Sequence, residues 1–195
     1  MYSKFNVLHI ISEHVRTIYE KDKRGEVNEL YFYFGMPILF SLLALFAPVT
    51  EGIATLISTV MSIFSGLLLN VQVLICDIKT KLIERSVNQI NADGSTFTDS
   101  QKHNLKAQQQ LTEELFKSIS FAIVLTLITI ISLFLWYLWT VPKQCYVWYF
   151  PITWKIGTHI FSAIIYYEMI LFLLTMFMIV KRSYALVMAT IIRAK

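Results

Sequence analysis

Glu168 is the residue of this chain best placed to do chemistry, because it is the one acidic or basic side chain deep within a long apolar segment. It lies twelve residues after Ile156 and twelve before Val180, so we expect it near the middle of a lipid bilayer. A carboxyl group there is costly unless it is protonated, paired or in contact with water. The position leaves open ion passage, proton coupling or a buried hydrogen-bond network that holds helices or subunits together. Tyr166 and Tyr167 are neighbouring hydrogen-bond donors.

Two rows of small and hydroxyl-bearing residues provide a second candidate surface. The first row comprises Ser58, Ser62 and Gly66, and a matching second row comprises Thr126, Thr129 and Ser132. Small residues at this spacing let helix backbones approach closely, so helix packing is the simpler interpretation. In a symmetric oligomer the same hydroxyl groups could instead line a pore, with Asn70 and Gln72 at its cytoplasmic mouth.

None of the residue patterns typical of enzymes occurs in the chain. It has no glycine-rich phosphate loop, no Cys or His pairs at metal-binding spacing and no nucleophile elbow. We therefore expect neither catalysis nor a metal ion or organic cofactor. The net charge of +4 is explained by the charge bias of membrane insertion, so direct binding to nucleic acid is not expected.

The composition requires these residues to be carried by membrane-spanning helices. Hydrophobic residues make up 56% of the chain, and the mean hydropathy is +0.58, which is far more apolar than a soluble domain of this size. Four apolar segments, residues 30–49, 53–76, 119–140 and 156–180, each come close to the ~20 residues that a spanning helix needs. We predict an all-α polytopic protein with two transmembrane hairpins, at 30–76 and 119–180.

The basic residues predict how these spans are oriented. Fifteen of the seventeen Lys and Arg residues lie in segments 1–29, 77–118 and 181–195. Short basic loops stay on the cytoplasmic side during insertion. Both termini and the central segment are therefore predicted to be cytoplasmic.

The cytoplasmic segments have helical periodicity of their own. Within residues 1–29, Leu8, Ile11, Val15 and Ile18 form one apolar face, which predicts an amphipathic helix followed by a charged connector. Residues 77–118 read as a helical hairpin with its tip at 91–95. The remaining residues, 181–195, are predicted to form a cytoplasmic tail.

The central hairpin is the largest surface predicted outside the lipid, so it is the natural place for a partner to dock. Its candidate docking residues are Lys79, Lys81, Arg85, Gln101, Lys102 and Lys106. The alternative is that the hairpin pairs only with copies of itself, and the sequence does not separate the two.

This organisation resembles the membrane subunit of the bacterial Kiwa anti-phage defence system. The resemblance rests on four spans, cytoplasmic termini and a basic helical hairpin between spans two and three, and it covers the whole chain without a diagnostic motif. It implies an oligomeric, tetrameric sensor in the bacterial inner membrane whose cytoplasmic face holds a soluble DNA-binding effector protein.

Two other function classes fit the same pattern. An oligomeric membrane effector that conducts ions would use Glu168 and the two hydroxyl rows. An immunity protein against a pore-forming bacteriocin would also be a compact four-span protein, although the long hairpin would then be surplus.

Overall fold

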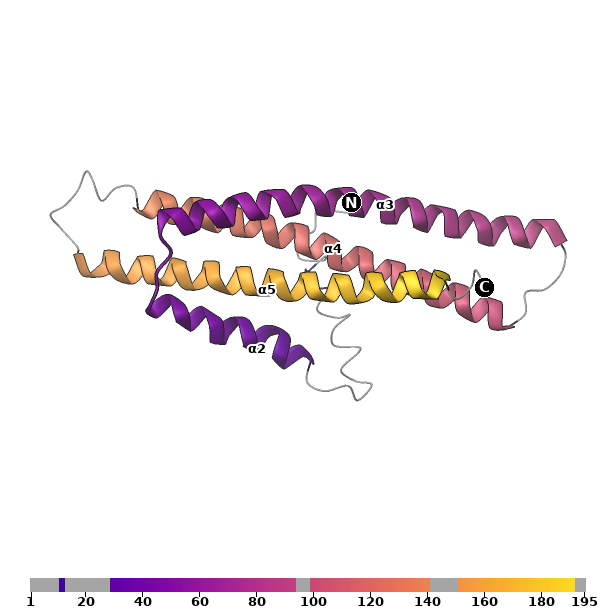
Figure 1. Ribbon diagram of the computed structural model, residues 1–195, viewed down its shortest axis with the longest axis horizontal. Helices are drawn as coiled ribbons and strands as arrows, with labels where there is room; N and C mark the ends of the chain where they lie inside the picture. The colour runs from indigo at the N-terminus through magenta and orange to yellow at the C-terminus, as the bar shows by residue number, and fades with distance from the viewer. Residues whose placement is uncertain (1–10, 13–28, 94–98, 141–150, 192–195) are drawn as a thin grey trace, which may run out of the picture.

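The computed structural model describes residues 11–12, 29–93, 99–140 and 151–191, and every regular element in these ranges is helical (Figure 1). In chain order the elements are α2 (Glu29–Ser41), the short 3₁₀-helix η1 (Leu42–Leu45), α3 (Glu51–Asp93), α4 (Asp99–Thr140) and α5 (Pro151–Ile191). The predicted all-α fold is confirmed for this part of the chain. The predicted amphipathic N-terminal helix lies outside the described residues, apart from Ile11 and Ser12.

The three long helices are much longer than a bilayer is thick. They contain 43, 42 and 41 residues, or about 63 Å each at 1.5 Å per residue, roughly twice the hydrocarbon thickness of a membrane. Their apolar parts, Glu51–Lys81, Lys106–Thr140 and Ile156–Met188, are long and apolar enough to cross a membrane. The protein therefore has the character of a membrane protein, with helices that continue beyond the apolar layer.

The first predicted span differs from the expectation. The α-helix ends at Ser41, and its apolar part, Phe32–Ser41, is shorter than the other three candidates. The Ser41 hydroxyl donates to the Ile38 carbonyl oxygen at 2.7 Å, a local side-chain bond of the kind that competes with a continued helix. The described structure thus contains three helices of spanning length, and a fourth span is not confirmed.

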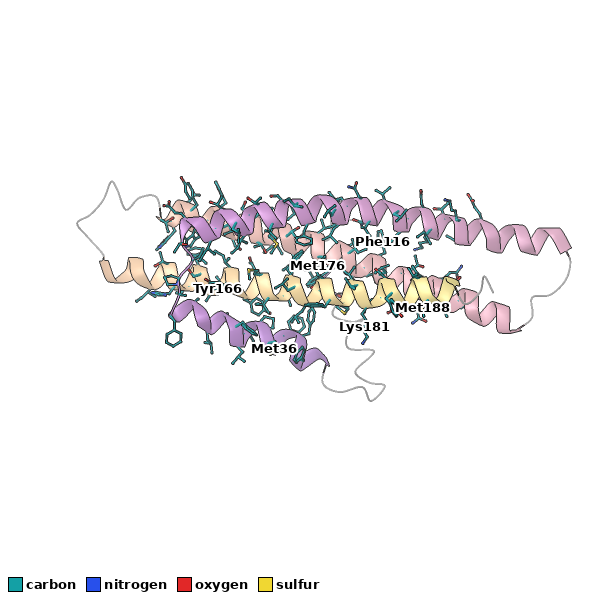
Figure 2. All side chains as sticks on the ribbon, in the orientation of Figure 1. Met36, Phe116, Tyr166, Met176, Lys181 and Met188 are labelled. Atoms are coloured by element: carbon teal, nitrogen blue, oxygen red, sulfur yellow. The ribbon has the colours of Figure 1, made fainter. Side chains whose placement is uncertain are left out.

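The helices pack in the order α3, α4, α5 and α2 (Figure 1). Helix α4 contacts both α3 and α5, and α2 contacts the far side of α5. Helices α2 and α3, which carry the predicted hairpin of residues 30–76, pack on other helices and do not approach each other closely among the described residues. In Figure 2, Lys181 and Met188 lie on the part of α5 that extends past α2.

Two hydrogen bonds from α5 explain why α2 and α3 separate. Nδ1 of His159 lies 2.9 Å from the carbonyl oxygen of Ala44. The Ser162 hydroxyl accepts the backbone N–H of Val49 at 3.0 Å. The link between α2 and α3 is thereby held against the start of α5. Thr50 then caps α3, accepting the Ile53 N–H on its hydroxyl at 3.5 Å.

The interior is a continuous apolar cluster between the helices, and the outside is also apolar. Ile119, Ala122 and Ile165 are completely buried where α4 meets α5. On the outward faces, Leu56 and Phe177 are 66% and 72% exposed. Apolar side chains on both sides of a helix are expected when its surroundings are lipid.

Replacement of Gly157 by alanine should destabilise the protein, because α4 and α5 are in close contact there. A Cβ atom at Gly157 would lie 2.6 Å from Nε1 of Trp139, whereas a Cβ at Gly66 would meet no heavy atom within 4 Å. We expect Gly157→Ala to lower the free energy of unfolding by about 1–3 kcal/mol. The matched Gly66→Ala variant should show no loss. Thermal unfolding in detergent followed by circular dichroism measures both, and equal stability of the two variants would contradict the packing described.

Candidate functional site

The Glu168 carboxyl is buried between α4 and α5 and has one clear hydrogen-bond partner. Its side chain is 7% exposed, and the Ser132 hydroxyl donates to Oε1 at 2.8 Å. The Thr129 hydroxyl, which donates to the carbonyl oxygen of Leu125 at 3.0 Å, also interacts with this carboxyl. Oε2 of Glu168 is buried and has no hydrogen-bond partner among the described residues. A buried hydrogen bond therefore links α5 to α4 at Glu168, and ion passage and proton coupling stay predictions.

Neither Tyr166 nor Tyr167 donates the hydrogen bond to Glu168 that the sequence suggested. Tyr166 and Tyr167 are both half-buried on α5, and the hydrogen bond to Glu168 comes from Ser132 on the next helix. The α4 row of hydroxyl residues thus supplies the partner. The sequence identified the residues of this row. Which of them lies opposite Glu168 depends on how α4 and α5 are aligned along their axes.

A hollow of about 560 Å³ adjoins Glu168, between α2, α4 and α5. Its walls are mostly apolar, with Phe34 from α2, Phe121 from α4 and Leu171 from α5 among them. Tyr167 and Ser41 also line it. The carboxyl that lies deepest in the apolar segment is therefore part of the wall of a space large enough for a small molecule.

The two hydroxyl rows have different surroundings. On α4, Thr126 and Thr129 are completely buried and donate to carbonyl oxygens of their own helix. On α3, Ser58 is half-buried, whereas Ser62 and Gly66 are exposed. The rows do not face each other within the chain. Their roles in packing between copies or in lining a pore stay predictions, since a second chain is needed for either.

Gln72 and Asn70, the two polar residues predicted at a pore mouth, also lie in different surroundings. Gln72 donates from Nε2 to the Ser120 hydroxyl of α4 at 3.1 Å, so it joins two helices of the same chain. Asn70 is exposed on the outer side of α3. In the apolar part of α3 an exposed amide is unfavourable in lipid unless a partner or water reaches it.

A second buried polar contact, which the sequence did not indicate, joins Arg182 of α5 to Glu114 and Ser118 of α4. Arg182 is 4% exposed. Its Nη1 donates to the carbonyl oxygen of Glu114 at 2.9 Å and to the Ser118 hydroxyl, and its Nε lies 3.9 Å from Oε2 of Glu114. We expected Arg182 in a cytoplasmic tail, but α5 continues through it to Ile191. The available signal was the apolar run Ala185–Met188 that follows Arg182.

The predicted docking residues lie on the outer surface, as far as the structure describes them. Lys79 and Lys81 on α3 and Lys106 on α4 are exposed. Arg85 is a position of α3, and Gln101 and Lys102 are positions of α4, but their side chains are outside the described set. Among the described residues, no group of three or more His, Cys, Asp or Glu side chains is arranged to hold a metal ion.

Loss of the Arg182 side chain should weaken the pairing of α4 with α5. Arg182→Ala removes two hydrogen bonds of a buried guanidinium and its contact with the partly exposed Glu114 carboxylate, which should cost about 1–3 kcal/mol. Lys181→Ala is the matched control, because Lys181 is adjacent and exposed. The unfolding temperature in detergent measures the difference. A loss in the Lys181 variant as large as in the Arg182 variant would show that the contact does not stabilise the fold.

A scan against protein-family models and searches of curated proteins and of solved structures found no match to this chain. The resemblance to the Kiwa membrane subunit therefore stays a prediction. Membrane character and the all-helical fold are the properties established for the described residues.

Proposed function

We propose that the protein is a sensor and anchor subunit of a bacterial anti-phage defence complex, which holds a soluble cytoplasmic effector protein at the inner membrane. The single observation that carries the anchoring role is the length of α3 and α4. Helix α3 has 43 residues, of which 31 belong to its apolar part, and α4 has 42, of which 35 do. On this proposal, the same two helices continue without a break from the lipid into water.

The ends of α3 and α4 provide a surface that a soluble partner can reach. The part of α3 beyond Lys81 adds about 18 Å at 1.5 Å per residue. Exposed lysines, Lys79, Lys81 and Lys106, surround the point where the helices leave their apolar parts. A partner with an acidic surface is favoured by this charge.

The proposed orientation places both termini in the cytoplasm. This requires α2 to be a fourth crossing, and its 13 residues with η1 make it a short one. A short apolar helix is accommodated by local thinning of the bilayer or by polar flanking residues. The five basic residues within 1–29 support a cytoplasmic start, and with four crossings the predicted hairpin segment 77–118 would be on the same side.

The defence role and the oligomer rest on the resemblance to the Kiwa membrane subunit. An oligomer also gives a physical account of Asn70 and of the Ser62 and Gly66 face, which no other helix of the chain covers within the described residues. Close contact between copies would bring a partner to the exposed amide. In an ion-conducting oligomer, the second candidate function, Asn70, Ser62 and Gly66 would line the pore.

Reversal of the lysine charges at the base of the hairpin should release the partner. In the combined variant Lys79→Glu, Lys81→Glu and Lys106→Glu, repulsion of an acidic surface should abolish co-purification while the protein stays in the membrane. Lys181→Glu, an exposed lysine on α5, is the control and should retain the partner. Native mass spectrometry after gentle extraction, with the flanking genes co-expressed, measures the retained proteins.

Each outcome of this experiment favours one of the function classes. Unchanged retention of the partner in the combined variant would contradict docking at the hairpin. A wild-type protein that is released as a bare oligomer would instead favour an ion-conducting effector, and a bare monomer would favour an immunity protein.

A further inference from the structure

We propose that the outward face of α3 binds α3 of a second copy of this chain, with Asn70 of one copy hydrogen-bonded to Asn70 of the other. The proposal rests on the oligomer of the proposed function and deepens it, because it names the surface that joins two copies. Two observations carry it. The Asn70 amide is exposed within the apolar part of α3, and the exposed residues around it repeat at the spacing of paired helices.

Asn70 lies at a depth where its amide needs a partner. The apolar part of α3 is Glu51–Lys81, and Asn70 is four residues past residue 66, its midpoint. That offset is about 6 Å at 1.5 Å per residue, whereas the hydrocarbon layer extends roughly 15 Å to each side of its midplane. The Asn70 side chain is exposed and makes no hydrogen bond among the described residues. An amide that faces hydrocarbon is unfavourable until a donor and an acceptor reach it.

The exposed residues around Asn70 follow the seven-residue repeat of paired helices. This outer seam of α3 has five members, separated by four, three, four and three residues: Thr59, Ile63, Gly66, Asn70 and Val73. All five are exposed. At about 100° per residue, the outer seam lies opposite the buried side of α3, which includes Met61 and Leu68. The seam therefore has the pattern against which another helix packs, on the side of α3 turned away from the described bundle.

A second copy is the partner that fits the outer seam. Copies of a membrane protein insert with the same orientation, so the symmetry axis that relates them is perpendicular to the membrane and their α3 helices run parallel. Residues of the same number then lie at the same depth, and Asn70 faces Asn70. An amide both donates and accepts, so the two side chains satisfy each other. A single Asn within such a repeat fixes the register of paired helices.

Gly66, one turn from Asn70, allows the two backbones to approach closely. A Cβ atom at Gly66 would meet no heavy atom within 4 Å, so the space in front of it is free for a second helix. Asp77, the next position of the repeat, is exposed near the end of the apolar part. Two carboxylates at the same depth repel each other, so the contact ends at Val73.

The hydroxyl groups beside Asn70 do not need a second copy. Thr59 donates to the carbonyl oxygen of Thr55 at 2.9 Å, and Ser62 donates to that of Ser58 at 2.8 Å. Both groups are satisfied within their own helix. The Asn70 amide is therefore the polar group of this face that a second copy satisfies.

Disulfide cross-linking in native membranes tests the interface. In a variant whose two native cysteines are replaced by serine, Ile63→Cys and Val73→Cys place a thiol on the outer seam. Leu67→Cys and Leu69→Cys are matched controls at similar depth, and all four native side chains are between 51% and 66% exposed. Oxidation should link two copies at the seam positions, where facing Cα atoms come within the ~4.4–6.8 Å that a disulfide spans. Equal cross-linking at all four positions, or none at the seam, would overturn the proposal.

Substitution of Asn70 tests the amide pair. Asn70→Leu keeps a side chain of similar size but removes the hydrogen bonds, so association should weaken severalfold. Asn70→Gln keeps the amide and should associate nearly as well as the parent chain. Fluorescence energy transfer between labelled copies in lipid vesicles, over a series of protein-to-lipid ratios, measures both. Association of the Leu variant as strong as that of the parent would contradict the role of Asn70.

These results are distinguishable from the test of the proposed function, because they use this chain alone. A wild-type protein that is oligomeric by native mass spectrometry but forms no cross-links at the seam would keep the oligomer and overturn this interface. Seam cross-links in a protein whose lysine variant still retains the cytoplasmic partner would keep the interface and contradict the docking surface.

Discussion

The alignment of α4 with α5 is fixed by two polar contacts at different depths, and the other helices depend on that alignment. Ser132 donates to Glu168 within the apolar part of the pair, and Arg182 donates to the Glu114 backbone and the Ser118 hydroxyl further along. A slip of one helical turn would leave Glu168 and Arg182 buried without these partners, at a cost of several kcal/mol. Apolar contacts alone would resist such a slip far less, because similar apolar side chains substitute for one another.

The aligned pair provides the surfaces on which α3 and α2 pack. Helix α3 lies along α4, joined by Gln72 and Ser120. Helix α2 lies along α5, where the hydroxyl groups of Tyr33 and Thr175 are 2.5 Å apart. Because α2 covers only part of α5, the far ends of the three long helices extend past it (Figure 1). The proposed docking residues Lys79, Lys81 and Lys106 therefore lie on α3 and α4, the two long helices that α2 does not contact.

The sequence predicted the parts of this structure that follow from composition and periodicity. Long apolar segments in lipid have to be helical, since the backbone finds no other hydrogen-bond partners there, and the all-α fold followed. The packing of α2 on α5 was not predictable, because it depends on His159 and Ser162 reaching Ala44 and Val49, residues far apart in the chain. Arg182 was assigned to a tail because a basic pair normally marks the end of a span. Its burial depends on Glu114 and Ser118 lying opposite, which hydropathy does not record.

The most direct test of this account is the distance between spin labels at the two ends of α3. Labels at Gly52 and Glu84, both exposed on α3, would be introduced by cysteine substitution in a variant whose two native cysteines are replaced by serine. Double electron–electron resonance in lipid nanodiscs should give a single narrow distribution centred near 48 Å, the length of one continuous helix at 1.5 Å per residue. A markedly shorter or broad distribution would show that α3 bends or ends at the membrane surface, and the rigid connection between membrane and docking surface would then be wrong.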